Sequence, residues 1–98
     1  MKKMEIEKIR TTVETQFREL FPKEKLVKVE VEEEEEDRDG DETLNIIVVF
    51  DGKKLLGGKR TLELTWRVRR KLEKDEDRFL TFGFCIKEEA GELGIALP

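Results

Sequence analysis

The sequence predicts a single small α+β domain, residues 1–98, in which helices pack on a three-stranded sheet in the order α-β-β-α-β. The run from Leu44 to Phe50 is apolar at almost every position and rich in β-branched residues. Such a run is typical of a strand covered on both faces. An amphipathic stretch with helical spacing opens the chain, and a second apolar run with strand spacing lies near its end. A length of 98 residues allows one modest core.

The first helix is expected from about Met4 to Leu20. Its apolar residues recur at steps of three and four, which places them on one stripe of a helix: they are Ile6, Ile9, Val13, Phe17, Leu20 and Phe21. Pro22 ends the helix, because the residue before a proline is pushed out of helical geometry.

Two antiparallel strands are expected after this helix. Residues 26–36 alternate between apolar and charged side chains, and the apolar positions are Val27, Val29 and Val31. Asp39-Gly40 is a favoured two-residue hairpin turn. Pairing across this turn, with Arg38 opposite Asp41, sets Val31 opposite Val48 and Val29 opposite Phe50, so that apolar residues share one face. A longer loop of the same parity would preserve that face.

Residues 60–74 fit two interpretations. The apolar residues alternate strictly with polar ones, which would make residues 60–70 a strand in an α-β-β-β-β meander: they are Leu62, Leu64, Trp66 and Val68. The segment is also rich in Leu, Glu, Arg and Lys, which are strong helix formers. We predict a helix from Thr61 to Lys74, with Thr61 as its N-cap and Leu64, Val68 and Leu72 on one side. Arg69 is an exception, because it falls inside the apolar arc.

The last strand is expected from Leu80 to Ile86, where large apolar residues alternate with smaller ones. A short helical turn over Lys87–Leu93 and a loose end over residues 94–98, which carries Ile95 and Leu97, complete the chain. Cys85 has apolar neighbours and is expected in the core. Trp66 stands among Leu and Val residues, so it is also expected there.

Composition excludes several classes of enzyme. The chain contains no His, no Ser and no Tyr. Without His it lacks the commonest general base and metal ligand, and Ser-His and Cys-His nucleophiles cannot form within one chain. The single cysteine excludes an internal disulfide framework. We therefore expect a protein that is not an enzyme and has no cofactor or metal, and rank carboxylate–metal catalysis last.

Two further features bear on location and source. No apolar run is long enough to cross a bilayer and no leader segment opens the chain, which predicts a soluble cytoplasmic protein. Abundant Glu, Lys and Arg beside one Asn and one Gln resemble the composition of thermophile proteins.

Two segments partly match ligand-binding motifs, but neither has all the residues that its motif requires. Asp37, Asp39 and Asp41 have the spacing that opens a calcium loop, but Glu42 and Val48 stand where the loop needs Gly and Glu. The segment Gly52–Arg60 likewise departs from a phosphate-binding loop, because the spacing of its glycines is wrong and no hydroxyl follows its lysine.

The middle of the chain resembles BolA-type proteins, which have a KH-like α-β-β-α-β arrangement. The resemblance lies in Phe50-Asp51-Gly52-Lys53-Lys54-Leu55-Leu56, followed by Arg60 and Leu72. In that family a strand ending in Phe-x-Gly-Lys leads through a basic turn into the second helix. The chain lacks the family's cluster-binding histidines, and Gly57 and Gly58 are adjacent where KH domains have Gly-x-x-Gly. The resemblance therefore implies the fold and does not imply metal or partner roles.

Charge is strongly segregated along a chain of net charge −4. Residues 30–42 hold ten acidic residues and one basic residue, whereas residues 53–74 hold nine basic and two acidic residues. The basic candidates for a binding site are Lys59, Arg60, Arg67, Arg70, Lys71 and Lys74. Glu32 and Glu34 represent the acidic segment.

We expect a small non-enzymatic interaction or regulatory protein that self-associates. Ile47 and Val49 lie on the sheet face opposite the one that Val48 and Phe50 share, and they need a cover, so a partner surface is predicted that combines them with the two charged segments. The alternative is a nucleic-acid-binding module that uses the basic second helix to contact phosphates. The acidic segment disfavours this alternative, because it would repel a polyanion.

Overall fold

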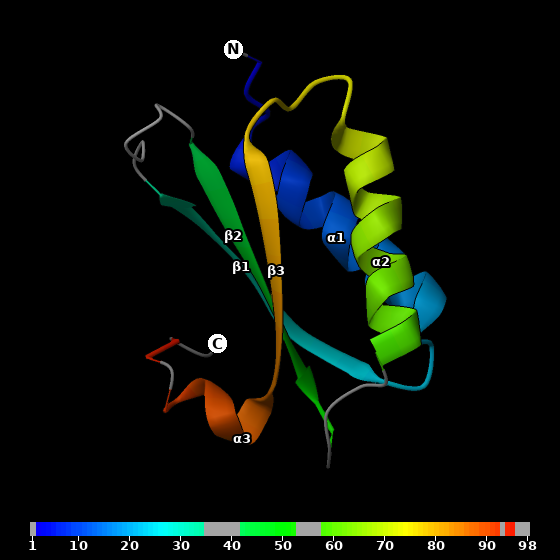
Figure 1. Cartoon of the computed structure of the whole chain (residues 1–98). Coiled ribbons are helices and arrows are strands. Elements are labelled where there is room, and N and C mark those ends of the chain that lie inside the picture. Colours follow the sequence, from blue (N-terminus) through cyan, green and yellow to red (C-terminus); the bar gives the residue numbers. More distant parts are fainter. Residues whose placement is uncertain (1, 35–41, 53–57, 93, 96–98) are drawn as a thin grey trace.

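The computed structural model of the chain describes residues 2–34, 42–52, 58–92 and 94–95. It is an α+β domain, as the sequence predicts (Figure 1). The elements in chain order are α1 (Ile6–Leu20), β1 (Lys25–Glu34), β2 (Thr43–Asp51), α2 (Gly58–Leu72), β3 (Phe79–Ile86) and α3 (Lys87–Ala90). The α-β-β-α-β order is confirmed, with α3 added at the end, and the strand interpretation of residues 60–70 is wrong.

The three strands form one sheet in the order β1-β2-β3, so the apolar run predicted as the central strand is β2. β1 pairs with β2 antiparallel and β3 pairs with β2 parallel. A parallel pair needs a crossover between its strands, and α2 provides it. Figure 1 shows α1 and α2 on one side of the sheet, called here the front face, and α3 on the other, the rear face.

The pairing of β1 and β2 has the predicted parity in a different register. Val29 lies opposite Val48 and Val31 opposite Ile46, two residues away from the pairing that a turn at Asp39-Gly40 would set. Those turn residues lie outside the described residues. The register shifts between Leu26 and Lys28, and this irregularity turns Val27 toward the rear face. The prediction that Val27 shares a face with Val29 is therefore wrong.

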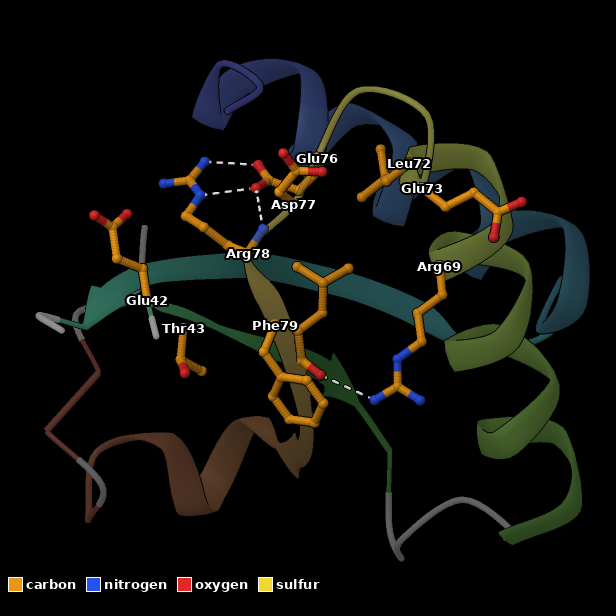
Figure 2. A pocket seen from close by; sticks show the side chains of 10 residues that line it. Glu42, Thr43, Arg69, Leu72, Glu73, Glu76, Asp77, Arg78 and Phe79 are labelled. Carbon is orange, nitrogen blue, oxygen red and sulfur yellow. Dashed lines mark hydrogen bonds and ion pairs between the residues drawn. The ribbon is translucent and has the colours of Figure 1, made fainter. Parts of the chain in front are cut away.

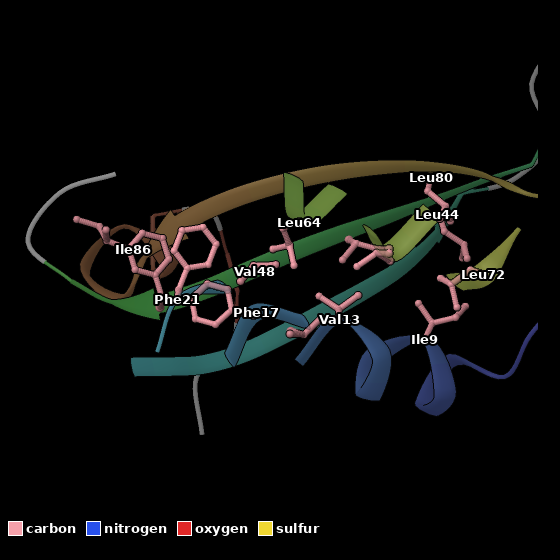
Figure 3. Close-up of a cluster of buried hydrophobic side chains, with 14 residues drawn as sticks. Ile9, Val13, Phe17, Phe21, Leu44, Val48, Leu64, Leu72, Leu80 and Ile86 are labelled. Carbon is pink, nitrogen blue, oxygen red and sulfur yellow. The ribbon is translucent and has the colours of Figure 1, made fainter. Parts of the chain in front are cut away.

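The main core lies between the front face and the two helices (Figure 3). Each helix contributes one stripe of buried apolar residues, namely Ile9, Val13 and Phe17 from α1 and Leu64, Val68 and Leu72 from α2. The sheet contributes alternate residues of all three strands, of which Leu44, Ile46, Val48 and Phe50 of β2 are fully buried. The apolar residues that recur with the helical period on α1 and α2 therefore pack against those that alternate along the strands, as their spacing in the sequence predicts.

A smaller cluster covers one end of the rear face. It consists of Val49, Cys85, Ala90 and Ile95, with Val27 and Ile47 packed at its margin. Cys85 is a core residue, as expected. Ile95 is buried, and its backbone N–H donates to the carbonyl of Ala90 at 3.0 Å, so the prediction of a loose end is wrong at this residue. Residues 96–98 lie outside the described residues.

Two local predictions about α2 are also corrected. The helix begins at Gly58, and Thr61 lies inside its first turn, where its hydroxyl donates to the Gly58 carbonyl at 2.8 Å. Thr61 is therefore not the N-cap. Among the described residues, no helix is both long and apolar enough to cross a membrane.

Candidate functional site

The largest apolar side chains that the described residues expose lie on α2 and at the start of β3. They are Leu62, Trp66 and Phe79, which are 72%, 59% and 62% exposed. Trp66 was expected in the core, and this prediction is wrong. The buried stripe of α2 begins at Leu64, and two residues of helix rotate the side chain by about 200°. A helix that buries Leu64 and Val68 must therefore turn Trp66 toward solvent.

The sequence itself indicates that α2 carries a second, exposed apolar stripe, which Leu62 and Trp66 form. Leu62 and Trp66 are four residues apart, so they are neighbours on one helical face. They alternate with Leu64 and Val68, which occupy the opposite face. The strict alternation that resembles a strand is therefore the mark of a helix with apolar residues on two faces. The exposure of Phe79 was harder to predict from the sequence, because Phe79 directly precedes Leu80, where the last strand was expected to begin.

Two arginines accompany the exposed aromatic rings. The guanidinium carbon of Arg70 lies 4.7 Å from the centroid of the Trp66 ring. The Arg69 guanidinium lies 5.9 Å from the centroid of the Phe79 ring and donates to the Leu80 carbonyl at 2.9 Å. Arg69 thus reaches out of the apolar arc, as a long charged side chain can. We call Leu62, Trp66, Arg69, Arg70 and Phe79 the outer α2 surface.

The basic residues singled out in the sequence all lie on or next to α2, but they do not form one free patch. Arg60 donates to the Leu20 carbonyl at 3.3 Å, at the end of α1. Arg67 pairs with Glu63 at 2.9 Å and lies 3.8 Å from Glu19 of α1. These two cations therefore fasten α2 to its neighbours. The remaining predicted residues are exposed: Lys59, Arg70, Lys71 and Lys74.

The predicted composite surface on the sheet is not formed. Val49 is fully buried beneath α3 and Ile95, and Ile47 is half-buried at the margin of the same cluster. Glu32 and Glu34 are exposed on β1. Because Val31 packs toward the front-face core, these glutamates point to the rear, away from α2. The chain itself supplies much of the cover that was assigned to a partner.

An open hollow of about 690 Å³ lies between the end of α2 and the start of β3 (Figure 2). Its lining includes Arg69 and Phe79, so it adjoins the outer α2 surface. At its back, Arg78 donates to Glu76 at 2.7 and 2.9 Å, and both side chains are almost fully buried. The backbone N–H of Met4 donates to Glu76 at 3.0 Å, and Arg78 donates to the Met4 carbonyl at 3.1 Å. This pair therefore anchors the segment that precedes α1.

The two buried charged groups of the hollow, Glu76 and Arg78, are paired with each other. Burial alone would raise the pKa of Glu76, but hydrogen bonds from Arg78 and Met4 outweigh it and lower that pKa. The hydrogen bonds to Glu76 raise the pKa of Arg78. Burial and the nearby Glu89 raise the pKa of the Cys85 thiol, which disfavours the thiolate. Within the described part of the chain, no three His, Cys, Asp or Glu side chains gather at a metal site.

Comparison of the chain with protein-family profiles, curated proteins and solved structures finds no match. The resemblance to BolA-type proteins stays a prediction. The function is therefore inferred from the geometry of the outer α2 surface.

Proposed function

We propose that the chain is a small non-enzymatic protein-interaction domain that self-associates through the outer α2 surface. The observation that carries this proposal is that Leu62 and Trp66, four residues apart on one face of α2, are each more than half exposed, with the exposed Phe79 beside Arg69 of the same helix. Scattered exposed apolar residues are ordinary, whereas contiguous ones rimmed by charge are typical of binding surfaces. Trp and Arg are also the residues that most often dominate the energy of protein interfaces.

The surrounding contacts support this proposal. The Arg70 guanidinium lies against the Trp66 ring, and Arg69 lies near Phe79. Ordered aromatic side chains lose less conformational entropy on binding, which favours association. The surface also lies on a helix packed against the main core by Leu64, Val68 and Leu72. Such a rigid support suits a docking surface.

The single tryptophan offers a direct test, because its fluorescence reports on the outer α2 surface alone. We expect the emission maximum of Trp66 to move to shorter wavelength as the protein concentration rises, in parallel with the mass measured by sedimentation equilibrium. A Trp66→Ala variant should sediment as a monomer at concentrations where the original chain is associated. A chain that stays monomeric at all concentrations and salt levels, with unchanged emission, would overturn the proposal.

Nucleic-acid binding by α2 is a second candidate, supported by the stacking of Arg70 on the exposed Trp66. Exposed aromatic rings stack on bases, and the neighbouring Lys71 and Lys74 could contact phosphates. The net charge of −4 and the pairing of Arg67 with two glutamates weigh against it. A gel shift with mixed RNA and DNA at low salt tests it. Retardation that salt abolishes would support this candidate, and no retardation would remove it.

A further inference from the structure

The outer side of α2 repeats with the spacing of a coiled coil. Successive steps of three, four, three and four residues connect Lys59, Leu62, Trp66, Arg69 and Glu73, and all five side chains are exposed. The helical hydrogen bonding continues to Glu73, whose N–H donates to the Arg69 carbonyl at 2.9 Å. Residues with this spacing form a seam along one side of a helix, and such seams pack against other helices.

The charges at the two ends of this seam are opposite. Lys59 stands at its beginning and Glu73 at its end, and neither forms an ion pair within the described part of the chain. A parallel pair of α2 helices would place Lys59 beside Lys59 and Glu73 beside Glu73. An antiparallel pair places Lys59 beside Glu73 at both ends. The charge pattern therefore selects the antiparallel arrangement.

We propose that the partner of the outer α2 surface is a second copy of this chain, bound with the two α2 helices antiparallel. This inference rests on the proposed function and specifies its partner and geometry. The two-fold axis passes near Trp66, so that the two indole rings lie at the centre. Leu62 of each copy packs on the aliphatic part of Arg70 of the other, and Lys59 of each faces Glu73 of the other. The contact is self-complementary, as a two-fold interface requires.

A second copy could instead add its β3 to the free edge of β3, because this strand has no charged residue from Phe79 to Ile86. The helix layer opposes that arrangement. α1 and α2 lie side by side over the sheet; two helices span about 20 Å, whereas three strands span about 14 Å. Edge pairing in one continuous sheet would therefore crowd the two α2 helices together. The Arg69 guanidinium also occupies the Leu80 carbonyl.

Charge exchange tests the antiparallel geometry. We expect Lys59→Glu and Glu73→Lys each to raise the dimer dissociation constant by about tenfold, because each change places like charges together at both ends of the seam. The double variant K59E/E73K restores the opposite charges and should return the constant to within about threefold of the original. Lys71→Glu makes the same charge change outside the seam and should have little effect. Sedimentation equilibrium at low salt measures each constant, and denaturant unfolding shows that each variant folds.

The possible outcomes separate this inference from the function on which it rests. Weakening by both single changes and recovery in the double variant would support the antiparallel pair. A dimer that Trp66→Ala dissociates but that the double variant does not recover would overturn the antiparallel pair and leave the proposed function standing. A chain that is monomeric at every concentration would overturn both.

Discussion

α1 and α2 are helices of equal length that pack side by side on the same face of the sheet, yet their outer sides differ. Each buries one apolar stripe, and each sends one arginine to a strand carbonyl. Arg10 of α1 donates to Val29 on β1, and Arg69 of α2 donates to Leu80 on β3. The exposed side of α1 is entirely polar, with Glu7, Lys8, Thr11, Thr15, Arg18 and Glu19. The exposed side of α2 carries Leu62 and Trp66.

This difference separates residues needed for folding from residues available for binding. One apolar stripe suffices to attach a helix to the sheet, as α1 shows. The second stripe of α2 therefore adds nothing to the core and leaves apolar surface in water, which natural surfaces usually avoid at a contiguous patch. The comparison of the two helices therefore supports α2 as the site of the proposed contact.

The largest expected effect is on the free energy of unfolding, and it compares one aromatic residue from each helix, Phe17 of α1 and Trp66 of α2. Phe17 of α1 is fully buried, and its ring centroid lies 6.3 Å from that of Phe50. Phe17→Ala should lower the free energy of unfolding by about 3–5 kcal/mol, because it leaves a cavity in the main core. Trp66→Ala should change it by less than about 0.5 kcal/mol in the monomer, because the side chain is largely exposed. Urea unfolding at low protein concentration measures both, and equal losses would contradict the division between the two helices.

A smaller effect is expected at the anchor of α1. Glu76→Gln should cost about 1.5–3 kcal/mol at neutral pH, because it removes a charged acceptor from the hydrogen bonds with Arg78 and Met4. The pKa of Glu76 is lowered from its ordinary value of 4.5. Its contribution to stability is therefore fully present above about that pH and is lost as the pH falls through the lower value of the folded state.

Unfolding measured between neutral and acid pH checks this expectation. Part of the stability that the original chain loses in acid should be absent from Glu76→Gln, whereas Glu14→Gln, at a partly exposed position of α1, should retain it. If Glu76→Gln lost as much stability in acid as the original chain, this would contradict the role of the Glu76–Arg78 pair.

Much of the fold followed from residue spacing, and the failures have identifiable causes. Ile9, Val13 and Phe17 share a helical stripe and Leu80 begins an alternating strand, so local pattern and tertiary packing agree. The alternation of apolar and polar residues in α2 resembles a strand because this helix carries apolar residues on two faces. The buried stripe of Leu64, Val68 and Leu72 was nevertheless predicted correctly. Nothing local indicates that the β1 register shifts near Leu26, because such a shift depends on the strand beside it.

The candidate site was predicted less well than the fold. Charge counts identified α2, but they could not show that Arg60 and Arg67 are held by α1. Burial of Val49 depends on Ile95, a residue 46 positions later that no local pattern assigns to the rear face. Exposure of Trp66 could have been inferred, because it follows from the choice of a helix with Leu64 buried.

The smallest effect on folding is expected when the outer side of α1 is made to resemble that of α2. Thr11 and Thr15 are exposed and four residues apart, like Leu62 and Trp66. Thr11→Leu with Thr15→Trp should change the free energy of unfolding by less than about 0.5 kcal/mol. Each copy would then carry two docking surfaces, so light scattering should detect assemblies larger than the proposed dimer. Adding Trp66→Ala should reduce their size, and an unchanged mass in the double variant would contradict the role given to the stripe.

The parallel pairing of β2 and β3 has a consequence for how the chain acquires its structure. β1 and β2 are neighbours in sequence and can associate early, whereas β3 must wait until the crossover through α2 has closed the longer loop. The latest strand is also the one without a charged residue. Refolding yield should therefore fall as the protein concentration rises, because chains in which β3 has not yet paired with β2 can associate with one another.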